Sequence, residues 1–423
     1  MPASVAVRVC TPTTAPGLEK DGFRWCGNVL WTGLFVSIYL SWSFRLYSGG
    51  NATWDVPGDI WVVYFGAIYV IHGGYAFIYQ SSHSYDYLPL PAVLMAPCEW
   101  VGERLHLVAG VPFYVRHPSM WLVYGPVTAV LCTPVTWASR ALAWALGVRR
   151  RLWCVQLTTL LVVSVPCAVF GHFEDALAIA ALLMVWRAAT RSRCVQMAVW
   201  CAVAIACKEW TILAVPLFVA RTPRGQRLRV SAIALLPPFL MVVPCLARNF
   251  WGTVSAVFLT ADEEVGRNGH PGFVAALVPG ALGRAGVLLL APLIVLLAKR
   301  LPLPAALSVV GCVFALRVVC EPVAFAYYWA APLGVLILLA TVTAYRISLL
   351  RCAVAMIPAA WSWPLTIKPD LWWPGMALAL ACLGLALRDA FRAAGQSPPS
   401  EVVAATSRVV PEAAIAVLPS TAA

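Results

Sequence analysis

Long apolar stretches alternate with short polar ones from about residue 25 to about residue 388. Repeated apolar stretches of roughly 20 residues are typical of transmembrane α-helices. The pattern therefore predicts an all-α polytopic membrane protein. Its candidate spans lie at about 25–44, 88–103, 119–139, 152–171, 173–187, 195–207, 210–220, 230–247, 272–297, 303–318, 323–345, 352–367 and 371–387.

The polar stretches divide into basic clusters and mixed clusters, and the basic ones set the topology. Basic residues cluster on cytoplasmic loops, so both termini should be cytoplasmic and about twelve spans should cross the membrane. The region 45–148 must then hold an odd number of crossings, and one of its two candidate helices should be interfacial or re-entrant. The expected divisions are a cytoplasmic segment 1–24, a transmembrane domain 25–392 whose first outer loop 45–118 carries interfacial helices, and a disordered cytoplasmic tail 393–423.

Composition supports the membrane class. Hydrophobic residues make up 61% of the chain and charged residues 11%, which excludes an ordinary soluble domain. The net charge of +12 comes from Lys and Arg scattered in short loops, so it indicates topology in a plasma membrane and no nucleic-acid partner. The 14 cysteines form no CxxC pair and are best explained as small apolar packing residues.

Mixed polar clusters interrupt the apolar stretches, and the predicted topology places all of them on the outer side. Ionisable residues beside apolar spans are costly unless they are solvated or paired, so this grouping favours one polar site at one membrane surface. The clusters are Asp55 with Asp59; His172 with Glu174 and Asp175; Lys208 with Glu209; the loop from Arg248 to His270; and Arg317 with Glu321.

The two aspartates follow the first predicted span. A carboxylate at this position can act as a general base that activates a hydroxyl group. Asp59 comes after Pro57 and Gly58 and before an apolar run, so the residues alone favour a helix N-cap slightly over a base. Either role is open from the residues alone.

The next two clusters are turns between apolar runs. His172, Glu174 and Asp175 either solvate a hairpin or bind a ligand; a divalent metal is conceivable, although their spacing matches no strong metal motif. Lys208 lies between two runs too short to cross a bilayer, which predicts a turn sunk below the surface. It either binds a phosphate or forms an internal salt bridge.

Two arginines complete the set. Arg248 ends a predicted span, where its guanidinium could bind a lipid phosphate. Arg317 and Glu321 are four residues apart and would share one helix face, as an ion pair or as part of a substrate site.

Four stretches, in this order, carry a resemblance to a known family. They are the region from Asp59 through Tyr64, Gly73 and Gly74 to YDYLPLP; GHFEDALA; KEWTILAVP; and Arg317 to Pro322 followed by Tyr327 and Tyr328. They resemble the GT-C superfamily of membrane glycosyltransferases, and most nearly the actinobacterial family 87 α-mannosyltransferases, over about residues 25–345. The sequence departs from that pattern in a longer Asp-to-Tyr spacing, in Lys-Glu-Trp at the lysine turn, and in Cys-Glu-Pro after Arg317.

The resemblance implies a GT-C-like fold with an outer-face active site. It implies that a sugar, mannose by analogy, moves with inversion from a polyprenyl-phosphate donor to a glycolipid or glycan acceptor of the cell envelope, without a cofactor. Asp59 would be the base, with Asp55 as the competing candidate. The implied donor-binding residues are His172, Lys208 and Arg248 for the phosphate; Glu174, Asp175 and Glu321 for the sugar, with Arg317 orienting Glu321; and Tyr64, Trp210, Tyr327 and Tyr328 for stacking.

Two other classes remain open. A secondary transporter or a flippase for lipids or polyprenyl-phosphate sugars would also carry membrane-embedded charges and about twelve spans. Such proteins usually show internal repeats and midplane charges, whereas here the charges fall at span ends and no repeat is visible. An envelope scaffold protein would tolerate alanine at Asp55, Asp59 and Lys208.

Overall fold

The structure is a computed structural model that describes residues 31–34, 36, 60–79, 87–108, 120–146, 148, 152–259, 280–301, 303–320, 326–335, 377, 381, 384, 385 and 388. Every regular element in this part of the chain is helical, which confirms the all-α fold class there. The elements are α2 (Ile60–Ile71), η1 (Tyr75–Phe77), α3 (Pro89–Arg104), α4 (Met120–Leu131), α5 (Pro134–Ala145), α6 (Leu152–Thr159), η2 (Leu160–Ser164), α7 (Val165–Phe170), α8 (Phe173–Thr190), α9 (Cys194–Cys207), η3 (Glu209–Ala214), α10 (Val215–Arg221), η4 (Arg224–Gln226), α11 (Arg227–Arg248), α12 (Phe250–Val254), η5 (Ser255–Leu259), α14 (Gly280–Leu297), η6 (Ala298–Arg300), α15 (Leu303–Cys320) and η7 (Ala326–Trp329).

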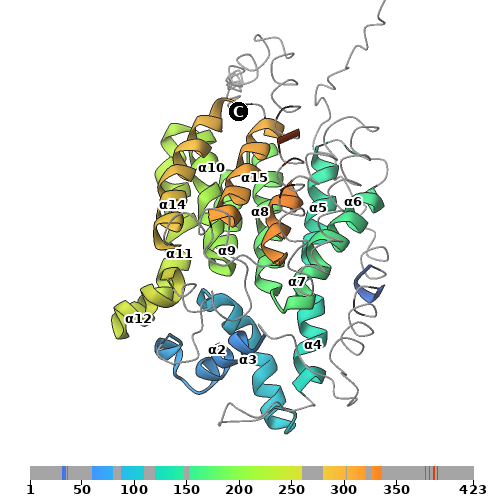
Figure 1. Ribbon diagram of the computed structural model, residues 1–423, viewed down its shortest axis with the longest axis vertical. Helices are drawn as coiled ribbons and strands as arrows, with labels where there is room; N and C mark the ends of the chain where they lie inside the picture. The colour runs from blue at the N-terminus through green and yellow to red at the C-terminus, as the bar shows by residue number, and fades with distance from the viewer. Residues whose placement is uncertain are drawn as a thin grey trace, which may run out of the picture.

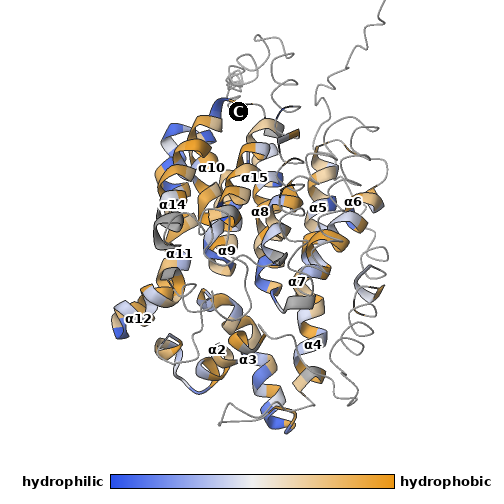
Figure 2. Cartoon of the chain, in the orientation of Figure 1, coloured by the Kyte–Doolittle hydropathy of each residue, from blue (hydrophilic) through white to orange (hydrophobic). Residues whose placement is uncertain are grey.

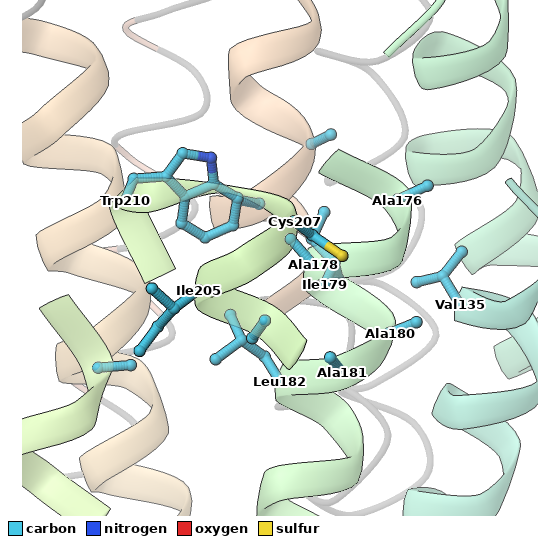
Figure 3. Close-up of a cluster of buried hydrophobic side chains, with 14 of the residues drawn as sticks. Val135, Ala176, Ala178, Ile179, Ala180, Ala181, Leu182, Ile205, Cys207 and Trp210 are labelled. Atoms are coloured by element: carbon cyan, nitrogen blue, oxygen red, sulfur yellow. The ribbon is translucent and has the colours of Figure 1, made fainter. Parts of the chain in front are cut away.

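The centre of the structure is α8, which packs between α9 and α5 (Figure 1). Its alanines let the neighbouring backbones approach closely, as small residues do at helix contacts in membranes. Ala176 and Ala180 lie on the side toward Val135 of α5, whereas Ile179 and Leu182 lie on the side toward α9 (Figure 3). The small side chains of α8 therefore fix two helix contacts at once.

A second set of helices covers the other side of α9. α11 packs on α9, α14 packs on α15, and α10 contacts both α11 and α14. The surfaces of α11 and α14 are predominantly hydrophobic (Figure 2), and large apolar side chains such as Phe239 and Leu289 are exposed on them. A large exposed apolar surface of this kind marks contact with lipid or with another protein.

Three helices, α2, α3 and α4, lie at one end of the bundle (Figure 1). α2 packs along α3, and α3 in turn contacts α4 and α9. α3 was one of the two candidate helices in the region 45–148, and the structure confirms that a helix is present there. Prolines 89 and 91 begin it, at positions where the missing N–H donor costs nothing.

The helical stretch from residue 152 to residue 170 is irregular in the middle. Residues Leu160–Ser164 form a π-helical turn that ends two residues before Pro166. The proline has no backbone N–H donor, which disfavours a regular pattern of helical hydrogen bonds. Gly171 ends the stretch with φ of +84°, a left-handed conformation that glycine adopts without strain. The break expected between 171 and 173 is therefore present, and it reverses the chain into α8.

Two helices among the described residues are long and apolar enough to cross a membrane, Leu122–Ala145 and Arg224–Arg248. Four shorter apolar helices accompany them: Val62–Ile71, Leu152–Ala168, Cys194–Cys207 and Ala305–Val318. The number of twelve spans stays a prediction. The candidate spans at 352–367 and 371–387, most of 25–44, and the proposed tail 393–423 lie largely or wholly outside the described residues.

Candidate functional site

The first half of the candidate site is the turn that begins α8. Because Gly171 is left-handed, His172 closes the turn, and its backbone N–H donates to the Cys167 carbonyl at 2.7 Å. Glu174 and Asp175 then occupy the first helical turn. Negative charge at this position is favoured by the helix dipole and by the free N–H groups of the first turn.

The second half is the turn between α9 and η3. α9 ends at Cys207 and Lys208 is extended, with φ of −152° and ψ of 125°. The Lys208 carbonyl accepts from the Thr211 hydroxyl at 2.9 Å, which fixes the start of the 3-10 turn. Since α8 and α9 pack side by side, the beginning of one helix and the end of the other meet at the same level.

His172, Glu174 and Lys208 form a buried chain of charged groups. The His172 Nδ1 lies 2.6 Å from Glu174 Oε1, and the Lys208 Nζ lies 3.5 Å from the same oxygen. An ionised carboxylate only accepts hydrogen bonds, so Nδ1 carries the proton that is shared with it. Two cationic or proton-donating groups thus converge on one carboxylate oxygen, which offsets the desolvation of all three.

Asp175 is held by a different donor. The Trp210 Nε1–H donates to Asp175 Oδ1 at 3.0 Å, while Asp175 Oδ2 lies 3.8 Å from the His172 Nδ1. The Trp210 ring is buried and meets Phe314 of α15 edge-on, with 4.8 Å between the ring centroids. Trp210 therefore links the acidic turn to α15.

Tyr87 closes the cluster from the segment before α3. Its hydroxyl oxygen lies 3.3 Å from the His172 Nδ1, and the Lys208 Nζ lies 4.1 Å from the centre of its ring. The Tyr79 hydroxyl donates to the Tyr87 carbonyl at 2.6 Å, which fixes the backbone there. A cation over an aromatic face is a favourable contact when it is desolvated.

Arg317 and Tyr328 join the cluster through Glu209. The Arg317 Nη2 lies 3.5 Å from Glu209 Oε1, and its guanidinium carbon lies 5.3 Å from the centre of the Tyr328 ring. Glu209 is the middle residue of the Lys-Glu-Trp turn. Its neighbours contact the acidic turn of α8, while Glu209 itself contacts α15.

A divalent metal was conceivable at His172, Glu174 and Asp175. Each offers one donor atom, and these atoms lie within 4.8 Å of one another. However, the donors are already committed within the cluster: Nδ1 is hydrogen-bonded to Glu174 Oε1, and the Lys208 ammonium stands beside that same oxygen. The donor set fits a metal in kind, but Lys208 already supplies the positive charge that a metal would bring to this carboxylate.

Two of the predicted site residues lie apart from this cluster. Arg248 is exposed at the end of α11, with its guanidinium carbon 4.7 Å from the centre of the Phe77 ring. Tyr64 is buried on α2, where its ring meets that of Tyr124 at 5.8 Å. Asp55, Asp59 and Glu321 lie outside the described residues, and Tyr327 is described only as part of η7.

Tyr64 belongs to a second buried polar cluster that sequence reasoning missed. Glu99 of α3 is fully buried, and the Tyr124 hydroxyl donates a short hydrogen bond to its Oε2. Glu99 Oε1 has no hydrogen-bond partner among the described residues. Burial and the neighbouring Glu103 carboxylate raise the pKa of Glu99 to about 7, against the lowering effect of the Tyr124 hydrogen bond.

Sequence reasoning also left Tyr87 and Glu209 out of the site. Tyr87 was part of the YDYLPLP stretch, so the position of a tyrosine before a proline-started helix was available as a signal. For Glu209, the only signal was its place between Lys208 and Trp210. No local pattern indicates that its carboxylate reaches Arg317.

No protein-family model matches the chain, and no curated protein matches it significantly. Over the described residues, fold and site define an all-helical protein with a buried, charged cluster built from His172, Glu174, Asp175, Lys208 and Trp210. The resemblance to membrane glycosyltransferases stays a prediction from the four sequence stretches.

Proposed function

We propose that the protein is a multi-pass membrane glycosyltransferase with a GT-C-like arrangement. It transfers a sugar, mannose by the sequence resemblance, from a polyprenyl-phosphate donor to a glycolipid or glycan acceptor of the cell envelope. The proposed setting is the outer face of a plasma membrane, with both termini cytoplasmic. The apolar composition, the exposed apolar surfaces of α11 and α14 and the clustering of charged residues support this setting.

The observation that carries the proposal is the state of the Glu174 carboxylate. Its Oε1 is shared by His172 and Lys208, but its Oε2 is buried and has no hydrogen-bond partner among the described residues. Leaving a buried acceptor unsatisfied costs about 1–3 kcal/mol, and more for a charged group. A sugar hydroxyl that donates to Oε2 would remove this cost, so the cluster is suited to a ligand rich in hydroxyl groups.

The same cluster offers what the transfer reaction needs around the sugar. Glu174 and Asp175 accept hydrogen bonds from sugar hydroxyls, Trp210 orients Asp175, and cations nearby stabilise the leaving phosphate. In the reaction, an acceptor hydroxyl oxygen forms a bond to the anomeric carbon while the bond from that carbon to the phosphate oxygen breaks. The hydroxyl proton passes to Asp59, with Asp55 as the competing base, and polyprenyl phosphate leaves with the electron pair.

Attack from the side opposite the phosphate inverts the anomeric centre. A β-linked donor would therefore yield an α-linked product. The polyprenyl chain would stay in the membrane beside the apolar helices, so that only the phosphate and the sugar need to enter the polar cluster.

Sugar transfer in membrane vesicles tests the proposal. Vesicles that contain the wild type, Asp59→Asn, Asp55→Asn or Glu174→Gln receive radiolabelled polyprenyl-phosphate mannose at equal protein content. We expect labelled product with the wild type, its loss with Asp59→Asn, and a raised donor KM with Glu174→Gln because the sugar loses one acceptor.

The outcomes separate the parts of the proposal. If Asp59→Asn and Asp55→Asn both label the product as strongly as the wild type does, neither aspartate is the general base. If the wild type forms no product with mannose, arabinose or glucose donors, the protein is not the proposed glycosyltransferase.

A proton-coupled transporter or flippase is the second candidate. The burial of His172, Glu174 and Lys208 inside the bundle favours it, because linked titratable groups inside a membrane protein are suited to carry protons. Movement of a fluorescent polyprenyl-phosphate sugar across vesicles without product formation would support this class over the enzyme.

A further inference from the structure

Two ion pairs join the lysine turn to its neighbours, and they differ in burial. The Lys208–Glu174 pair is almost fully enclosed, with side-chain exposures of 7% and 0%. The Arg317–Glu209 pair is partly open, with exposures of 17% and 24%. The nitrogen–oxygen distance is 3.5 Å in both pairs. Solvent can reach the second pair, and so can a ligand.

Glu209 is held in place by the residues on either side of it. Lys208 is fixed by Glu174, and Trp210 is fixed by Asp175 and by the ring of Phe314. Phe314 lies three residues before Arg317, about one turn earlier on α15. These contacts fix the position of the lysine turn relative to α15. The Glu209 carboxylate therefore lies next to the Arg317 guanidinium.

The position of Arg317 suits a phosphate ligand better than it suits Glu209. A guanidinium presents a planar fork of N–H donors that matches phosphate oxygens, and phosphate carries more negative charge than a carboxylate. A 3.5 Å contact between Arg317 and Glu209 at a partly solvated site is a weak ion pair. Lys208, in contrast, is buried and committed to Glu174.

We propose that Glu209 is a positioning residue that acts as an exchangeable counter-ion. Its carboxylate holds the Arg317 guanidinium over the Tyr328 ring until the phosphate of a ligand takes its place. This inference rests on the proposed function, because it assumes that the ligand carries a phosphate group. Arg317 then contacts the phosphate, and Glu209 fixes the position of the guanidinium before the ligand binds.

Binding of geranyl phosphate, a short isoprenyl phosphate, to purified protein in detergent tests the inference. Glu209→Gln removes the competing charge and keeps the size of the side chain. We expect it to bind the probe about two- to five-fold more tightly than the wild type, as the loss of a weak ion pair predicts. Glu209→Asp keeps the charge and should bind like the wild type, and Arg317→Gln should bind at least about ten-fold more weakly.

A structural role alone would not raise affinity. If Glu209 only stabilised the fold, Glu209→Gln would bind the probe equally or more weakly, and that result would overturn the inference. Glu103→Gln is the matched control, because Glu103 is also a partly exposed glutamate and its Oε1 contacts His72 Nε2 at 3.0 Å, outside the cluster. We expect it to leave the affinity unchanged.

The failure of the inference and that of the proposed function give different results. If the wild type binds geranyl phosphate and transfers sugar but Glu209→Gln shows no gain, Glu209 is not a counter-ion and the proposed function stands. If the wild type binds neither geranyl phosphate nor inorganic phosphate, the phosphate-bearing ligand itself is wrong.

Discussion

The ammonium group of Lys208 lies 3.5 Å from the Glu174 carboxylate, and both side chains are buried. The two residues end one helix and begin another, and they meet because α8 and α9 pack against each other. The pair therefore joins the fold to the candidate site. Inside the bundle, each of these buried charges compensates the other.

Removing one charge from this pair should be far more damaging than removing both. Lys208→Met leaves the buried Glu174 carboxylate with His172 but without the Lys208 ammonium, which should lower the free energy of unfolding by up to about 3–5 kcal/mol. The double variant Lys208→Met, Glu174→Gln removes both charges of the pair. It should recover most of the lost unfolding free energy, because neither residue is then a buried charge without its partner. Thermal unfolding in detergent measures the difference, and a double variant as unstable as the single one contradicts the pairing. Neither variant should transfer sugar.

Trp210→Phe should separate the hydrogen bond of Trp210 from its packing. Phenylalanine keeps an aromatic ring against Phe314 but cannot donate to Asp175. A hydrogen bond to a charged group contributes about 1.5–3 kcal/mol, so we expect a loss of that order in unfolding free energy and a higher donor KM. Trp153→Phe, at an exposed position on α6, is the control and should change neither quantity. Equal behaviour of the two variants would show that Asp175 does not depend on Trp210.

Hydropathy predicted several of the helices, such as α8, α9, α11 and α15, because an apolar run inside a membrane must be helical to satisfy its backbone. It gave no span for α2, and the span expected at 210–220 is the 3-10 helix η3 followed by the short helix α10. It also predicted the break at Gly171 and His172, since a glycine followed by charged residues interrupts an apolar run. It did not predict which clusters meet. The partners Glu174 and Lys208, and likewise Glu209 and Arg317, are distant in sequence and are joined only by helix packing.

Glu99 was missed for another physical reason. A single carboxylate in an apolar helix has no local pattern that separates a solvated residue from a buried one. Its burial depends on how α3 packs against α2 and α4, and its hydrogen bond comes from Tyr124 of α4. Only the tertiary structure brings these two side chains together.

Gly171→Ala should disturb the turn that presents His172. Gly171 has φ of +84°, a conformation in which an alanine Cβ is strained by about 1–2 kcal/mol. We therefore expect a loss of stability of that order together with lower transfer activity, because the α8 turn carries three cluster residues. Gly225→Ala is the matched control, since its backbone is not left-handed and no atom lies within 4 Å of the added Cβ. Unfolding midpoints that are equal for both variants would contradict this account.

The exposed apolar surface of α11 should face lipid. Leu236 is 52% exposed in the middle of a helix long enough to cross a membrane, and a charge there should cost several kcal/mol in a bilayer. Leu236→Glu should therefore reduce the yield of membrane-extracted, monodisperse protein. Leu228→Glu is the control on the same helix, because Leu228 is exposed between Arg227 and Arg229 at the helix start. Equal yields would show that the middle of α11 is not embedded in lipid.

Stability should fall as pH rises through the range in which Glu99 titrates. Burial raises the pKa of Glu99 from an ordinary value of 4.5 to about 7 in the folded protein. Between these values the folded state keeps a proton that the unfolded state has released, so each rise in pH favours unfolding. The contribution of Glu99 to the unfolding midpoint should be full below about pH 4.5 and should decline until about pH 7; above that, Glu99 adds no further slope.

Two variants isolate Glu99 from the other titrating groups. Glu99→Gln removes the titration, so its unfolding midpoint should decline less than that of the wild type over the same range. Tyr124→Phe removes the hydrogen bond that lowers the pKa of Glu99, so the decline should extend to higher pH. Thermal unfolding at a series of pH values measures all three proteins. Glu99 Oε1 has no hydrogen-bond partner among the described residues, so a protonated carboxyl is the form that burial favours. If the unfolding midpoint of the wild type changes with pH as that of Glu99→Gln does, the Glu99 carboxyl is not protonated in the folded protein.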